Sequence, residues 1–158
     1  YGYSIAKNSN LNEQISKDDT ANLYVIHGTP RLDTVGIDSI SYSASFLELI
    51  SENNFTCSLE GAFPYFEIND VIKSRIEKLG LKKVQVVPLL LVSGNHYIED
   101  MFEIKDDLSD KFESFIVPSL TKSEKFNLIE LPMIQNIIEK NIQNTFKMMG
   151  ISHKEITY

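Results

Sequence analysis

Two histidines and one glutamate of this sequence each follow a short apolar run and have a glycine nearby: His27, Glu60 and His96. Neutral imidazole and carboxylate oxygen are ligands that suit Zn, Co, Ni and Fe(II) alike, and three of them can leave a coordination position open. The same groups can accept and release protons near neutral pH. The pattern therefore predicts a site for a divalent cation or for proton transfer, and it does not choose among the metals.

Each candidate also has an ordinary structural interpretation. A histidine at a strand end can cap a helix or bond a loop carbonyl, and a lone glutamate such as Glu60 is usually solvated. Three capable residues at equivalent places weaken that interpretation for the set. Other candidates fit structural roles better: His153 in a polar tail, Cys57 within an expected strand, and Glu99 with Asp100 in an acidic first helical turn.

The elements that must position these side chains are short apolar runs alternating with helical periodicity. Strands are expected over residues 23–26, 55–59, 82–92 and 115–117, with 126–129 a weaker rival for the fourth. Helices are expected over residues 35–51, 67–79, 97–108 and 132–149. This order predicts an α/β fold whose mainly parallel sheet is covered on both faces. Ligands of such sheets bind beyond the carboxyl ends of the strands, which is where the three candidates lie.

The composition fits one domain and excludes several classes of function. The chain has 158 residues and a formal charge of −7, which argues against nucleic acid or an anionic membrane as the main partner. A single cysteine, Cys57, cannot form an internal disulfide. The longest apolar run, residues 84–92, is far shorter than the ~20 residues of a membrane span. Because the chain opens at Tyr1, a signal peptide could lie upstream. We expect a cytoplasmic protein, or a periplasmic one if such a signal peptide exists.

Three segments of the sequence form an ordered set: VIHGTP at residues 25–30, LEG at residues 59–61 followed by Pro64, and VPLLLVSGNHYIEDM at residues 87–101. Together they resemble the anaerobic sirohydrochlorin cobaltochelatase family. The first element alone is weakly specific, and the ordered set is much more so. Two positions differ from the family pattern: Asn95 stands where an aspartate is expected, and the turn containing Ala62 is one residue longer than usual.

The resemblance implies a class II chelatase fold, a three-layer sandwich with a four-stranded mainly parallel sheet, as one lobe of a two-lobed fold. It covers the carboxyl-terminal half of the long family members. We therefore expect residues 1–22 to be a linker or arm from a missing amino-terminal lobe, residues 23–150 the chelatase lobe and residues 151–158 a tail. The partner across the tetrapyrrole would be the missing lobe or a second subunit. In a homo-oligomer, another copy of this chain would be that second subunit.

The function implied is insertion of Co(II), a substrate, into sirohydrochlorin or a closely related tetrapyrrole in cobalamin biosynthesis, a lyase-class metal chelatase reaction. By motif, the ligands and catalytic groups would be His27, Glu60 and His96, with His27 the principal base. Residues expected to contact the tetrapyrrole are Thr29, Ser93, Phe63 and Tyr97. For Phe63 and Tyr97, core packing is the default and stacking on a planar ligand is open.

Two other functions stay open at this point. A chelatase-like protein could present the same histidines as a non-catalytic metal or haem carrier. A metal-dependent hydrolase is weaker, because no hydrolase motif is present. The charge of −7 should repel a substrate rich in carboxylates; local donors such as Arg31, or basic residues of the missing lobe, would have to offset it.

Overall fold

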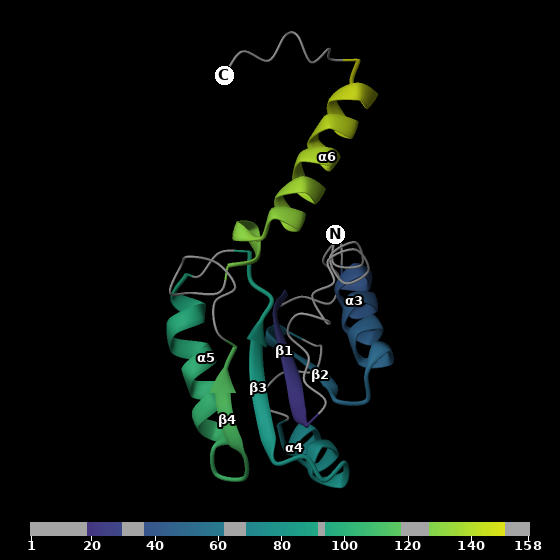
Figure 1. Cartoon of the computed structure of the whole chain (residues 1–158). Helices are drawn as coiled ribbons and strands as arrows, with labels where there is room; N and C mark the ends of the chain where they lie inside the picture. Colours follow the sequence, from purple (N-terminus) through teal and green to yellow (C-terminus); the bar gives the residue numbers. More distant parts are fainter. Residues whose placement is uncertain (1–18, 30–36, 62–68, 92–93, 118–126, 151–158) are drawn as a thin grey trace.

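A four-stranded parallel sheet forms the centre of the protein, in the order β2-β1-β3-β4. The computed structural model describes residues 19–29, 37–61, 69–91, 94–117 and 127–150. The elements in chain order are β1 (Thr20–Thr29), α3 (Ile37–Ile50), β2 (Asn54–Gly61), α4 (Asn69–Lys78), β3 (Lys83–Pro88), α5 (Asn95–Leu108), β4 (Glu113–Ile116), the 3₁₀ turn η2 (Leu128–Glu130) and α6 (Pro132–Met148). The chain therefore has the predicted α/β architecture, with β1 in the middle between β2 and β3 (Figure 1).

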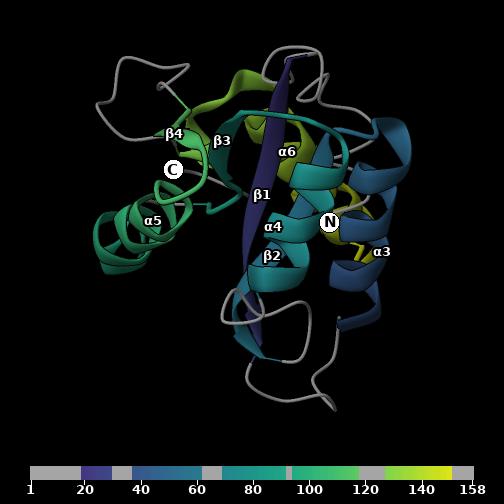
Figure 2. The same ribbon diagram turned by 90° about the horizontal axis from the view of Figure 1, so that it is seen from below.

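Helices lie on both faces of the sheet. Figure 2 shows α5 beside β4 at one end of the sheet and α3 at the other. On α3, Glu48 accepts hydrogen bonds from the backbone N–H and the hydroxyl of Thr56. On α4, the Arg75 guanidinium stacks over the Phe55 ring at 4.9 Å from its centroid. Because Phe55 and Thr56 are successive strand residues and point to opposite faces, α3 and α4 cover different faces.

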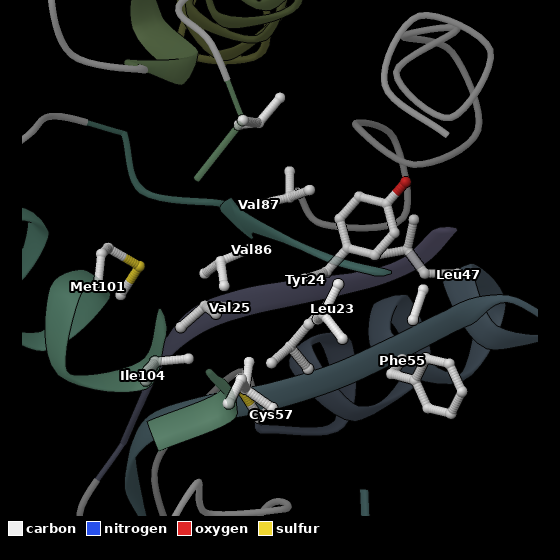
Figure 3. Close-up of a cluster of buried hydrophobic side chains, with 14 of the residues drawn as sticks. Leu23, Tyr24, Val25, Leu47, Phe55, Cys57, Val86, Val87, Met101 and Ile104 are labelled. Carbon is white, nitrogen blue, oxygen red and sulfur yellow. The ribbon is translucent and has the colours of Figure 1, made fainter. Parts of the chain in front are cut away.

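The face beneath α4 and α5 carries a large part of the apolar core. Strand register puts Leu23, Phe55 and Val86 in one row, and Val25 with Cys57 in the next row on the same face. All of these side chains are buried. Figure 3 draws the buried cluster, with Met101 and Ile104 of α5 close to Val25 and Val86; it also shows Tyr24, Leu47 and Val87 from the face beneath α3. Burial of such side chains is the main favourable contribution to folding.

The face beneath α3 is more polar. Asn22, Asn54 and Gln85 occupy one row across β1, β2 and β3, and their side chains are fully buried. The Asn22 amide donates to Asn54 Oδ1 at 3.1 Å, and the Gln85 amide donates to Asn22 Oδ1 at 3.3 Å. The Asn54 amide donates to the Leu47 carbonyl of α3 at 2.8 Å. We call Asn22, Asn54 and Gln85 the amide row. Because these bonds form only in one register, the amide row specifies strand alignment.

The sequence predicted the four helices and four strands in the right order, with some boundaries wrong. β1 begins at Thr20 rather than at residue 23, because the polar residues Thr20 and Asn22 are buried strand residues. β3 ends at Pro88 rather than at residue 92, because the backbone beyond Leu89 turns to other partners: the Leu90 and Leu91 carbonyls accept hydrogen bonds from Leu128 and Ile129. The predicted fourth strand near residue 115 is confirmed as β4, and the rival segment contains η2 rather than a strand.

The last helix, α6, begins with Pro132 in its first turn, as predicted, and extends away from the sheet in Figure 1. Gly150 follows it with φ of +73°, the conformation that ends many helices. Within the described part of the chain, no helix has both the length and the apolar character that crossing a membrane requires.

Candidate functional site at the carboxyl edge of the sheet

The carboxyl ends of β2, β1 and β3 bring the three predicted site segments to one edge of the sheet. His27 lies in β1 and Glu60 lies in β2, and pairing of these strands continues to Thr29 and Gly61. Both residues are therefore in the strands rather than just after them, because parallel pairing extends beyond the apolar runs. His96 is the second residue of α5, the helix that follows β3. Since β1 lies between β2 and β3, the segment carrying His27 lies between the other two.

Gly28 lies in β1 at this edge, with the backbone of β2 close beside it. Its partner in the register is Glu60. Its φ of +79° lies in the left-handed region that favours glycine. A Cβ at this position would overlap the carbonyl oxygen of Glu60 and would stand 2.8 Å from the Ser58 Cβ. The absence of a side chain therefore permits the observed distance between the two strand ends.

The exposed His27 ring lies close to a backbone carbonyl, and this contact favours one tautomer of the neutral imidazole. Its Nδ1 lies 3.3 Å from the carbonyl oxygen of Gly28. Because a carbonyl oxygen can only accept, this contact is a hydrogen bond only when Nδ1 carries the proton. In that neutral tautomer Nε2 holds the lone pair. Nε2 is then the nitrogen suited to bind a cation or take up a proton.

The half-buried Glu60 leaves its strand on the other side of the sheet from His27. Side chains alternate along a strand, so Glu60 shares a row with Gly28, whereas His27 belongs to the same face of β1 as Val25. The two functional groups can therefore meet only beyond the strand ends. Among the side chains that the structure describes, no group of three or more His, Cys, Asp or Glu is arranged to hold a metal ion. The His96 side chain lies outside the described set.

The start of α5 also lies at this edge. Its N-cap is Gly94, which makes no side-chain cap hydrogen bond. The first N–H groups of a helix have no partner within the helix and carry partial positive charge, a combination that suits anionic groups. Thr29 is the last residue of β1, and Tyr97 is the third residue of α5. The other predicted contact residues lie outside the described residues: Phe63, Ser93 and Arg31.

Two further expectations concern residues set aside in the sequence. Cys57 is fully buried in the apolar core, and burial raises the pKa of its thiol, so it is a packing residue as predicted. His153 lies outside the described residues. Sequence reasoning noted Gly28 only as a neighbour of His27 and missed its contact with Glu60. The signal was present, since a glycine directly after a strand-end histidine is a common sign of close backbone approach.

A model of the family described as cobalt chelatase (CbiK) matches residues 4–147. The chain belongs to this family. Membership agrees with the resemblance carried by the strand-end segments, which contain His27, Glu60 and His96. No curated protein matches the chain significantly.

A solved structure supports the chelatase-like fold independently of sequence. It is a protein from Marinobacter aquaeolei VT8 that carries the name CbiX and is assigned to cobalamin (vitamin B12) biosynthesis. The two structures align with a TM-score of 0.61 over 82% of this chain and 98% of that chain, at 18% sequence identity. At this identity the likeness concerns the fold alone. The parallel sheet with helices on both faces thus has the chelatase-like fold that the sequence predicted.

Proposed function

We propose that this protein inserts Co(II) into sirohydrochlorin or a closely related tetrapyrrole during anaerobic cobalamin biosynthesis. The observation that carries the proposal is the match to the cobalt chelatase family, which spans all three strand-end segments. The placement of those segments at the carboxyl edge of a parallel sheet adds support, because ligands of such sheets bind there. Co(II) is a substrate in this reaction, and its ligands in the protein would be His27, Glu60 and His96.

Metal insertion has two requirements that these residues can meet. Co(II) must exchange bound water for protein ligands and then for tetrapyrrole nitrogens, and two pyrrolic protons must leave the macrocycle. His27, with the lone pair on Nε2, would bind the cation and accept a proton in turn. Glu60 would supply a negative charge that offsets part of the cation's charge, and His96 would complete the ligand set. Two protons are released for each Co(II) inserted, so the charge balances.

The substrate's carboxylates need partners in a chain of net charge −7. The uncapped N-terminus of α5 offers backbone N–H groups at the same edge. Thr29, Ser93 and Arg31 would add donors, while Phe63 and Tyr97 would stack on the macrocycle. A second lobe or a second subunit, in a homo-oligomer for example, would cover the opposite side of the tetrapyrrole and supply further positive charge.

The proposal is tested by mixing the protein with Co(II) and sirohydrochlorin and following the absorption spectrum. Co(II)-sirohydrochlorin formed in molar excess over protein, faster than in a protein-free control, supports the enzyme. A spectral change that stops at one equivalent of protein contradicts it and indicates a carrier of metal or tetrapyrrole instead. Substituting protoporphyrin IX, the metal-free macrocycle of haem, for sirohydrochlorin in a parallel reaction tests whether the tetrapyrrole carboxylates select the substrate.

A further inference from the structure

Gly28 lies next to two of the three residues of the proposed metal site, His27 and Glu60. Through its backbone carbonyl it approaches Nδ1 of His27 at 3.3 Å. Through its missing side chain it makes room for the backbone carbonyl of Glu60. No other glycine whose surroundings the structure describes has this character: an added Cβ at Gly80, Gly94 or Gly150 would meet nothing within 4 Å.

We propose that Gly28 is a positioning residue that sets the separation and orientation of His27 and Glu60. This inference rests on the proposed use of those two residues as ligands of Co(II). Gly28 would act in two ways. It holds the His27 ring with the proton on Nδ1, and it lets β1 lie against Glu60 at the end of the sheet.

The need for glycine at this position has two separable causes. One is the backbone conformation, because φ of +79° is unfavourable for any residue with a Cβ. The other is the space taken up by the Glu60 carbonyl and the Ser58 Cβ. Since the obstacle at Glu60 is backbone, an added methyl group cannot be accommodated by turning a flexible side chain. The end of β2 must shift, and Glu60 must move with it.

Gly80 provides a matched control for the first cause. Its φ of +72° is nearly the same as that of Gly28, and a Cβ there would stand in open space. It follows α4 and lies in the turn before β3, at the opposite edge of the sheet from the proposed site. Gly80→Ala therefore carries the backbone strain alone, whereas Gly28→Ala carries the strain and the clash.

The experiment compares wild type, Gly28→Ala and Gly80→Ala by titration with Co(II), followed through the visible absorption of the bound metal. Gly80→Ala should bind Co(II) as wild type does, although its unfolding temperature falls. Gly28→Ala should bind about tenfold or more weakly, as is typical when a residue that orients a metal ligand is changed. Equal affinities in the two alanine variants would overturn the positioning role.

A second measurement needs no metal, and its wild-type part needs no variant. Long-range ¹H–¹⁵N NMR spectra at pH 8 report which ring nitrogen of a neutral histidine carries the proton. In wild type we expect the His27 proton on Nδ1, and in folded Gly28→Ala we expect a mixture of tautomers. A His27 ring protonated on Nε2 in wild type would overturn the inference. Failure of wild type to bind any Co(II) would instead contradict the proposed function. The NMR measurement of the His27 tautomer would still test whether Gly28 orients the His27 ring.

Discussion

Two sets of polar residues belong to the same three strands or their immediate continuation, one inside the sheet and one at its carboxyl edge. The amide row, Asn22 with Asn54 and Gln85, is fully buried, and its members hydrogen bond to one another and to α3. The strand-end set is His27, Glu60 and His96. In that set His27 is exposed and Glu60 is half-buried.

The chemical types of the two sets follow from these surroundings. Amides are neutral and can both donate and accept, so a buried row of them can satisfy itself without ionisation. Charged or titratable groups would be costly in the same place. At the edge, water and ligands can reach the side chains, and residues that change protonation or bind cations become useful. The comparison teaches that polar residues in this sheet stabilise register when buried and are available for chemistry only at the strand ends.

The largest expected effect is on activity at the edge. His27→Ala should lower the rate of Co(II) insertion by about 10² to 10⁴-fold, because it removes a proposed ligand and a proposed general base. Stability should change little, since the His27 ring is exposed. Initial rates with sirohydrochlorin check the expected loss of activity, and thermal unfolding of the same samples checks the expected stability. A folded variant that keeps its turnover would remove His27 from the mechanism.

The next largest effect should come from the amide row and should be on stability. Asn22→Ala leaves the Asn54 and Gln85 side chains without their shared partner, at a cost of about 3 kcal/mol in the free energy of unfolding. Asn141→Ala, on the exposed surface of α6, is the control and should cost less than about 0.5 kcal/mol. Urea unfolding measures both. If the two variants are equally stable, the buried amides do not contribute as we describe.

Alkaline pH should destabilise the protein through groups buried in the sheet. Burial raises the pKa of both Tyr24 and Cys57. In the unfolded chain these groups lose protons near their ordinary pKa values, about 8.5 for Cys and 10 for Tyr, while the folded protein keeps them. The unfolded state then binds fewer protons, so stability is complete below these values and falls as the pH rises above them.

Tyr24→Phe isolates the tyrosine contribution. Between pH 10 and 11 its unfolding free energy should decline less steeply than that of wild type, by at most about 1.4 kcal/mol per pH unit. Tyr42→Phe, at a side chain 56% exposed, should leave the slope unchanged. Urea midpoints collected from pH 8 to 11 provide the comparison. Parallel curves for wild type and Tyr24→Phe would show that Tyr24 is not kept neutral by burial.

The smallest effect concerns the outer edge of the sheet at β2. Glu48 accepts two hydrogen bonds from Thr56 and pairs with Arg75 at 3.0 Å. Glu48→Ala should cost about 1 kcal/mol and should expose a strand N–H that can pair with another molecule. Glu103→Ala on α5, an exposed position, is the control. Unfolding and light scattering would report the two effects, and a variant as stable and as monodisperse as the control would contradict them.

The fold was predictable from the sequence because its apolar runs and helical periodicities are consistent with one another. The start of β1 was not, since Thr20 and Asn22 look like residues of a polar arm. Both are buried, and the Asn22 side chain has hydrogen-bond partners in Asn54 and Gln85 across the strands. Such partners are distant in sequence, and no local pattern reveals them. The division of the chain into arm, lobe and tail at residues 1–22, 23–150 and 151–158 stays a prediction.

The sequence was sufficient to predict which residues lie at the carboxyl edge of the sheet. Topology brings His27, Glu60 and the start of α5 together, as the strand-end pattern indicated. The orientation of the side chains was not predictable, because it depends on strand register and alternation. That register places Glu60 beside Gly28 rather than beside His27, and it is the basis of the role that we propose for Gly28.

The most direct test of the strand-end set is a Co(II) titration of wild type and single alanine variants, followed by visible absorption. We predict one high-affinity Co(II) per chain in wild type, and loss of that binding in His27→Ala, Glu60→Ala and His96→Ala. His153→Ala, a histidine outside the set, should bind as wild type does. Unchanged Co(II) binding in the three strand-end variants would contradict the assignment of the metal site to this edge of the sheet.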